Sequence, residues 1–183
     1  MSTKEKQSII EEIKIPENVN FEIIGSMMKI SGPAGENEFP FKHPKMSIKK
    51  EDDKIVLRSD GKKRNQKKII MSLKAHIKNM VYGVIKNYTY KLKICSGHFP
   101  MTVSVLNNKV IIKNFFAEKI PRQANILSKV SVKIDHDLIT VSGANKEHVG
   151  QTAANLEQAC RITNKDRRVF MDRIYIISKG EEE

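Results

Sequence analysis

The sequence predicts an α+β protein made of two tandem, duplicated domains, each an antiparallel β-sheet with one long helix packed on it. Three observations predict this fold. A β-forming run that begins near a proline occurs twice, a sharp corner follows each run, and each copy then continues with a strand and an amphipathic helix. We expect an N-terminal α+β domain over residues 1–85 and a C-terminal one over residues 86–183. A hydrophobic content of 39% is sufficient for two small cores.

The first repeated feature is a β-hairpin. It begins near Pro16 in one copy and near Pro100 in the other, 84 residues later. The runs are NFEII and MMKIS in the first copy, and TVSVL and KVIIKN in the second. Both pairs are rich in β-forming residues, and Asn107-Asn108 is suited to the turn of the second hairpin.

A sharp corner follows each hairpin. The first copy has Gly-Pro-Ala-Gly at 32–35, and the second has Asn-Phe-Phe-Ala at 114–117, an offset of 82. We expect Phe115 and Phe116 to fold back onto the core while the charged residues after them face outward. The two phenylalanines would then anchor a corner whose cations remain exposed.

Each copy then continues with a strand and a helix. KIVLRS (54–59) precedes a helical pattern at 63–81, and LITVSG (138–143) precedes one at 145–162. The two apolar stripes share one spacing at an offset of 83: Ile69, Ile70, Leu73 and Ile77 in the first, and Thr152, Ala153, Leu156 and Cys160 in the second. The near-constant offset favours duplication over chance similarity between two ordinary α+β domains.

Composition indicates the class of partner. The chain has 33 Lys and Arg against 21 Asp and Glu, a net charge of +12. This excess favours a polyanionic partner, usually nucleic acid, over the alternative of an ordinary soluble protein with a high pI. No apolar run approaches the roughly 20 residues of a membrane-spanning helix, so we expect no membrane partner.

Catalytic patterns are missing from the sequence. Its five histidines are scattered, and no zinc-binding spacing or nucleotide-binding glycine loop occurs. We therefore expect no enzyme, no cofactor, no metal site and no small-molecule substrate.

The first cluster of candidate RNA contacts lies on the first helix. With Lys63 set at zero, Lys74 falls near 20°, Lys67 near 40° and Arg64 near 100°, away from the apolar stripe. No acidic residue interrupts this face, although a basic face is often merely solvated. The helix start adds backbone N–H groups suited to phosphate. The candidates here are Lys62, Lys63, Arg64, Lys67 and Lys74.

Two further basic clusters lie in the second half. One contains Lys165, Arg167, Arg168 and Arg173, and the other contains Lys113, Lys119 and Arg122. Arginine suits bidentate phosphate contacts. The nearby Asp166 and Asp172 leave open that some of these arginines pair inside the protein. Aromatic content of 6% without Trp argues against a base-stacking platform, so folded double-stranded RNA, contacted along its phosphates, fits best.

Four motifs carry a family resemblance. They occur in the order Asn79–Val84, Gly97–Pro100, Asn114–Lys119 with Arg122, and Lys165–Tyr175. In this order they resemble the archaeal and eukaryotic branch of the universal large-subunit ribosomal protein family that is called L-six in bacteria and L-nine in eukaryotes. The resemblance covers nearly the whole chain.

The resemblance implies a function. Members are structural constituents of the large ribosomal subunit and bind its rRNA, mainly through the C-terminal domain. The site lies near the sarcin–ricin loop and the stalk base, where translational GTPases dock, among neighbouring large-subunit proteins. It also implies residence in the cytoplasmic ribosome, after assembly in the nucleolus if the source is eukaryotic. The alternative is a non-ribosomal RNA-binding module or assembly factor on the same fold.

Three departures from the family pattern stand out. Ala117 occupies a position that is usually Gly in the family. Arg173 also stands where the family usually has Gly, and we expect it to add a phosphate contact or to alter a turn. The stretch after Arg58 lacks a tryptophan-containing insertion that is common in eukaryotic members, which we interpret as a trimmed eukaryotic version.

Overall fold

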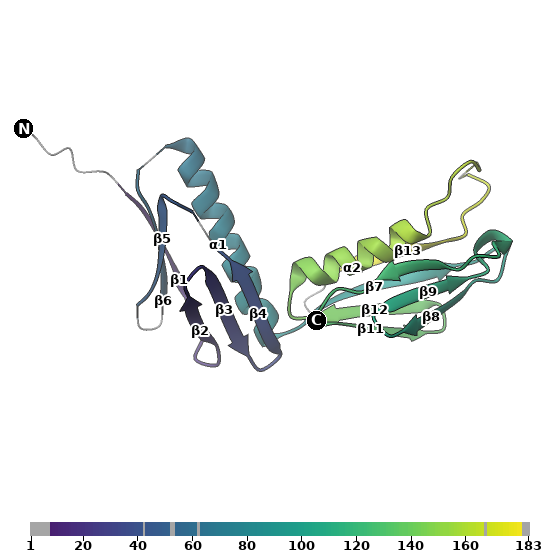
Figure 1. The fold of residues 1–183 in the computed structure, drawn as a ribbon, viewed down its shortest axis with the longest axis horizontal. Coiled ribbons are helices and arrows are strands. Elements are labelled where there is room, and N and C mark those ends of the chain that lie inside the picture. The colour runs from purple at the N-terminus through teal and green to yellow at the C-terminus, as the bar shows by residue number, and fades with distance from the viewer. Residues whose placement is uncertain (1–7, 42, 52–53, 62, 167, 181–183) are drawn as a thin grey trace, which may run out of the picture. The chain divides into compact units, whose positions relative to one another are not determined.

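The computed structural model describes residues 8–41, 43–51, 54–61, 63–166 and 168–180 (Figure 1). The chain divides into two compact units, Met1–Lys86 and Asn87–Glu183. The division falls one residue after the domain boundary expected from the sequence. Each unit combines antiparallel strands with one α-helix, which confirms the α+β prediction.

Among its described residues, the first unit has two three-stranded antiparallel sheets and one helix. The first sheet has the order β1 (Ile9–Lys14), β6 (Lys54–Ser59), β5 (Met46–Glu51). The second has the order β2 (Asn20–Ile24), β3 (Met27–Gly32), β4 (Gly35–Pro40). Helix α1 (Arg64–Ile85) follows β6. The hairpin and the strand KIVLRS therefore form as expected, but the β-structure is divided between two sheets.

The second unit contains a four-stranded and a three-stranded sheet. The larger has the order β11 (Val130–Asp135), β12 (Leu138–Gly143), β7 (Tyr88–Cys95), β13 (Arg173–Lys179). The smaller has the order β10 (Arg122–Asn125), β9 (Lys109–Lys113), β8 (Thr102–Leu106). A 3₁₀ turn, η1 (Phe115–Ala117), follows β9, and helix α2 (Lys146–Ala159) lies between β12 and β13.

The two units share one topology, which confirms the predicted duplication. Strands β1 to β6 and helix α1 match β7 to β12 and α2 in sequence order. The pairing order also matches: β1-β6-β5 corresponds to β7-β12-β11, and β2-β3-β4 corresponds to β8-β9-β10. The second unit differs by one added strand, β13, which pairs with β7.

Each unit has its own hydrophobic core beneath its helix. The predicted stripes are buried at Ile70, Leu73 and Ile77 in α1, and their counterparts in α2 are buried as well. Ile69 is the exception, because its side chain is 38% exposed. The buried face of α1 is centred on Ile70, Ile77 and Val84, and this places Ile69 at its border.

Side chains fix the start of each helix. In α1, the Gln66 amide accepts the Lys63 N–H at 3.1 Å and donates to the Asp60 carbonyl at 2.7 Å. In α2, Asn145 accepts the N–H of Glu147 at 2.9 Å and that of His148 at 3.2 Å. These bonds satisfy backbone groups that a helix end leaves open.

Candidate nucleic-acid interface

The corner after β9 is a tight left-handed turn. Asn114, Phe116 and Ala117 have φ values of 59°, 49° and 58°. The Asn114 side-chain amide donates to the Pro100 carbonyl at 2.8 Å, which ties the corner to the turn before β8. The motifs Gly97–Pro100 and Asn114–Lys119 are therefore adjacent in space.

Aromatic rings join these two motifs to the loop between α2 and β13. The Phe115 and Phe116 rings meet edge to face with centroids 4.8 Å apart. Phe116 also contacts Phe99 at 5.9 Å and Phe170 at 5.8 Å between centroids. Only Phe115 is fully buried, whereas Phe116 is half-buried at the surface. Both rings therefore fold back onto the core as expected, Phe115 as a buried member and Phe116 as a partly buried ring packed against it.

An exposed lysine covers two of these rings. The Lys165 ammonium lies 5.3 Å from the centroid of the Phe116 ring and 5.2 Å from that of Phe170. Such cation–π contacts hold a positive charge at a defined point without neutralising it. We call Phe99, Phe116, Phe170 and Lys165 the aromatic–lysine patch. Its side chains come from the turn before β8, the corner after β9 and the loop between α2 and β13, which is yellow in Figure 1.

A buried carboxylate orders the loops beneath this patch. Asp172 is 4% exposed and accepts the backbone N–H groups of Gly97 and His98, the latter at 3.1 Å. The imidazole Nδ1 of His98 lies 3.3 Å from the Asp172 Oδ2. Burial favours the neutral acid, but the N–H donors of Gly97 and His98 outweigh it and hold the pKa of Asp172 below its usual range. Asp172 therefore pairs with the turn and not with an arginine.

Arg122 has internal partners. Its guanidinium makes a bidentate pair with Glu118, with Nε–Oε2 and Nη2–Oε1 distances of 2.8 and 2.6 Å. Nη1 donates to the carbonyls of Ala159 and Arg161 at 2.9 and 3.0 Å, and the group lies 4.2 Å from the centroid of the Phe115 ring. The hydrogen bonds from Arg122 hold the pKa of Glu118 below its usual range. Arg122 thus joins the corner to the end of α2, and little of its donor capacity remains for phosphate.

The other arginines predicted to contact RNA differ in their exposure and in their partners. Arg173 is half-buried at the start of β13, with Nη2 3.4 Å from the Glu157 carbonyl and the guanidinium 5.6 Å from the centroid of the Tyr175 ring. Arg168 is exposed and pairs with Asp166 at 3.0 Å. Arg167 lies outside the described residues. The Arg168 side chain is therefore accessible to an external anion, whereas the Arg173 guanidinium contacts other residues of the second unit.

The lysines of the corner are exposed. Lys113 ends β9 and Lys119 follows η1. Within the described ranges, no carboxylate lies within ion-pair distance of Lys113, Lys119 or Lys165. These three cations are therefore available to an external anion.

The basic face of α1 is smaller than the sequence suggests. Lys63, Arg64 and Lys67 are exposed. Lys74 is half-buried, and its ammonium donates to Glu11 of β1 at 2.6 Å. Lys62 lies outside the described residues. The α1 face therefore offers Lys63, Arg64 and Lys67, whereas Lys74 stabilises the contact of the helix with β1.

Sequence reasoning missed the partners of Lys165 and Asp172. Lys165 lies 49 residues from Phe116 in the sequence, and Asp172 lies 75 residues from Gly97. No local pattern connects residues at such separations. In the part of the chain that the structure describes, no group of three His, Cys, Asp or Glu side chains could hold a metal ion. None of the described helices is both long and apolar enough to span a bilayer.

Comparison with known proteins shows relatives that match nearly the whole chain. The family described as Ribosomal protein L6 matches residues 15–87 and 99–173, one segment in each half of the chain. A "Large ribosomal subunit protein uL6" from Staphylothermus marinus is 48% identical, with 96% of this chain and 97% of the relative covered.

Two other relatives carry the same name. The protein from Methanobrevibacter smithii is 44% identical, with 94% of this chain and 97% of the relative covered. The one from Methanococcus vannielii is 44% identical, with 94% of each chain covered. All three are archaeal, whereas the shortened stretch after Arg58 had favoured a eukaryotic member. The matched segments, the shared topology of the two units and the identity over nearly the whole chain agree: the chain belongs to the ribosomal protein L6 family of the large ribosomal subunit, and it is not an enzyme.

Proposed function

We propose that the protein binds large-subunit rRNA mainly through its C-terminal half, at the aromatic–lysine patch and the corner cations beside it. The observation that carries this proposal is the exposed Lys165 ammonium held over the Phe116 and Phe170 rings. Lys113 at the end of β9, Lys119 after η1 and Arg168 in the loop between α2 and β13 are exposed as well. Arg167, outside the described residues, belongs to the same proposed set by its position in the sequence.

Internal hydrogen bonds hold two of these segments, the Gly97–Pro100 turn and the corner after β9. Asp172 holds the Gly97–Pro100 turn, and Arg122 joins the corner to the end of α2. Ordering side chains and loops on binding costs affinity, so a surface that is already fixed loses less. The lysines supply phosphate contacts, and the exposed parts of the rings offer an apolar face to ribose or to an unpaired base.

The family resemblance supports a finer location. The rRNA site would lie near the sarcin–ricin loop and the stalk base, among neighbouring large-subunit proteins, and would support the surface where translational GTPases dock. The protein would act in cytoplasmic ribosomes, after nucleolar assembly if its source is eukaryotic. The basic face of α1, with Lys63, Arg64 and Lys67, is a secondary candidate for RNA contact.

The direct test is the affinity of the full chain for an rRNA fragment that contains the sarcin–ricin loop, measured across a salt series. Lys119→Ala and Lys165→Ala should each weaken binding and lower the salt slope by roughly 0.7–0.9 per contact. The matched control is Lys133→Ala, an exposed lysine of β11, and its slope should equal that of the unmodified protein. Equal slopes for all three variants would contradict the proposal.

A further inference from the structure

The two halves differ at one sheet edge. In the second unit, β7 has a strand on each side, β12 and β13. Its counterpart in the first unit, β1, pairs with β6 and with no other described strand. The registers are equivalent, because Ile13 lies opposite Ile55 as Leu92 lies opposite Ile139. The outer edge of β1 therefore corresponds to the edge of β7 that β13 occupies.

In the second unit, β13 fills the space between β7 and the end of α2. Ile174 lies opposite Ile94 and is fully buried, and Ile176 lies opposite Leu92. The Arg173 guanidinium reaches the Glu157 carbonyl of α2. β13 thus combines backbone pairing along β7 with inward-facing apolar side chains under the helix.

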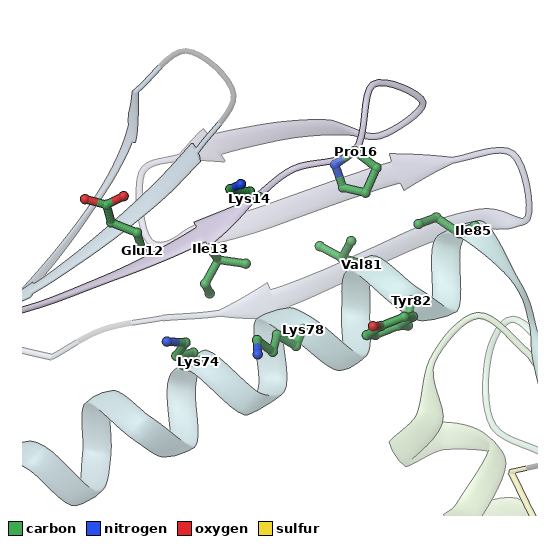
Figure 2. A pocket seen from close by; sticks show the side chains of 9 residues that line it. All are labelled: Glu12, Ile13, Lys14, Pro16, Lys74, Lys78, Val81, Tyr82 and Ile85. Atoms are coloured by element: carbon green, nitrogen blue, oxygen red, sulfur yellow. The ribbon is translucent and has the colours of Figure 1, made fainter. Parts of the chain in front are cut away.

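The first unit has a groove at the corresponding place. It has a volume of about 370 Å³ and lies between β1 with the residues after it and the C-terminal part of α1 (Figure 2). Figure 2 shows the side chains of Ile13 and Val81 lying between the strand and the helix. The residues from α1 are Lys74, Lys78, Val81, Tyr82 and Ile85. Lys74 and Ile77 of α1 correspond to Glu157 of α2 and Cys160 at its end, and both of these residues contact the start of β13.

The chemistry of the groove is apolar with positive charge at its rim. Tyr82 and Ile85 are 59% and 41% exposed, so two large side chains of α1 offer apolar surface in the groove. The acidic neighbours are already paired, Glu12 with Lys54 at 2.9 Å and Glu11 with Lys74 at 2.6 Å.

Lys14 and Lys78 are the other rim cations. Both are exposed, and no carboxylate among the described residues lies within ion-pair distance of either. The unneutralised charge of the groove is therefore positive.

We propose that this groove binds an extended, acidic and β-branched segment of another protein, which adds to β1 as β13 adds to β7. Backbone pairing along β1 would supply affinity, and alternate apolar side chains would lie against Val81, Tyr82 and Ile85. A carboxylate of the segment would pair with Lys78 or Lys14. RNA fits less well, because phosphates can meet the lysines but cannot pair with a strand edge or fill the apolar floor. This site is separate from the rRNA surface and does not depend on it.

The test uses the full chain and a synthetic peptide, DEIYIISEG, which keeps the apolar pattern of β13 and replaces its two cations with Glu. Binding is measured by calorimetry, and backbone pairing by slowed hydrogen exchange in residues 9–15. Lys78→Glu should weaken binding by roughly fivefold, since an attraction becomes a repulsion. Tyr82→Ala should weaken it through lost apolar contact. Lys67→Glu, on the same stripe of α1 but about 16 Å along the axis, should leave the affinity for the peptide unchanged.

Any of five results would overturn the proposal. The peptide does not bind at millimolar concentration, or it binds equally well to the Lys78→Glu and Tyr82→Ala variants. Another such result is self-association of the protein in sedimentation that both variants abolish, because the groove would then be an interface between two copies of the chain. A further such result is peptide binding only after removal of residues 1–7, because the occupant of the groove would then be the protein's own N-terminus. Lastly, Lys78→Glu lowers rRNA affinity without any peptide binding, so that the groove belongs to the RNA surface.

Discussion

Among single residues, Arg122 is a predicted RNA contact whose guanidinium has partners inside the protein. Its guanidinium joins Glu118, two carbonyls at the end of α2 and the Phe115 ring. Arg122→Ala should therefore lower the free energy of unfolding by about 1–3 kcal/mol, because it leaves a carboxylate and two carbonyls without their donor. Urea unfolding measures this loss.

The matched control for Arg122 is Lys119→Ala, which should leave stability within about 0.5 kcal/mol. The salt slope of rRNA binding should behave in the opposite way, falling for Lys119→Ala and not for Arg122→Ala. If Arg122→Ala keeps its full free energy of unfolding but has a lower salt slope of rRNA binding, the prediction is contradicted and Arg122 contacts RNA.

Ala117 carries backbone strain at the corner. Its φ of 58° is in the left-handed region, where a side chain with a Cβ is disfavoured. Ala117→Gly should raise the free energy of unfolding by about 0.5–1 kcal/mol, because the relief of strain exceeds the added entropy of the unfolded glycine. The midpoint of urea unfolding measures the gain. A loss of stability would mean that the corner does not hold Ala117 in this conformation.

Asp172 should make the free energy of unfolding depend on pH in the acidic range. Its pKa is lower in the folded protein than in the unfolded chain, where it is about 3.9. Its contribution is therefore fully present above that value and is lost as pH falls through the lower, folded pKa. The stability difference between the unmodified protein and Asp172→Asn should be constant near neutral pH and shrink below about pH 4. Urea unfolding at several pH values tests this, and a difference that does not change with pH would contradict it.

Element scale: the sequence predicts most elements but not their pairing. The hairpins, the strands at 54–59 and 138–143 and both helices follow from local apolar patterns, and the structure contains all of them. Helix α1 ends at Ile85 and not at 81, because Val84 is packed in the core and keeps the last turn helical. The division into two sheets and the pairing of β13 with β7 depend on contacts between distant residues, which local patterns do not record.

The candidate RNA site could be predicted only in part for the same reason, because local patterns do not record contacts between distant residues. The corner cations and the tight turn could be predicted because they are adjacent in the sequence. The pairing of Lys74 with Glu11, and of Arg122 with the end of α2, could not be, since the partners lie 63 and 37 residues apart. Positive charge in a sequence therefore gives an upper limit to the number of RNA contacts.

Strand β13 should be essential to the second unit. Ile174 is fully buried, so Ile174→Ala should lower the free energy of unfolding by about 2–5 kcal/mol. Ile177 of the same strand is 56% exposed, and Ile177→Ala should change stability by about 0.5 kcal/mol or less. Chemical unfolding of both variants tests the pairing. Equal effects would mean that β13 does not pack against the core as described.

Whole-molecule scale: the net charge of +12 is distributed between internal and external roles. Lys74 and Arg122 stabilise their own units, and Arg173 is directed into the second. The exposed cations in the second unit include Lys113 at the end of β9 and Lys119, Lys165 and Arg168 in loops, and those at α1 include Lys63, Arg64 and Lys67. Assembly into a polyanionic particle would use the exposed set, whereas changes in the internal set would act through folding.

Retention on large subunits across a salt series tests the central claim most directly. The unmodified chain, a Lys119→Ala/Lys165→Ala double variant and the Lys133→Ala control are each incubated with large subunits that lack the protein, and are then sedimented through sucrose at rising salt. We predict that the unmodified and control proteins stay with the large-subunit peak after a moderate-salt wash. The double variant, equally stable in urea, should leave it at lower salt. Equal retention of all three proteins, or an unmodified protein that sediments free or with the small subunit, would contradict the account.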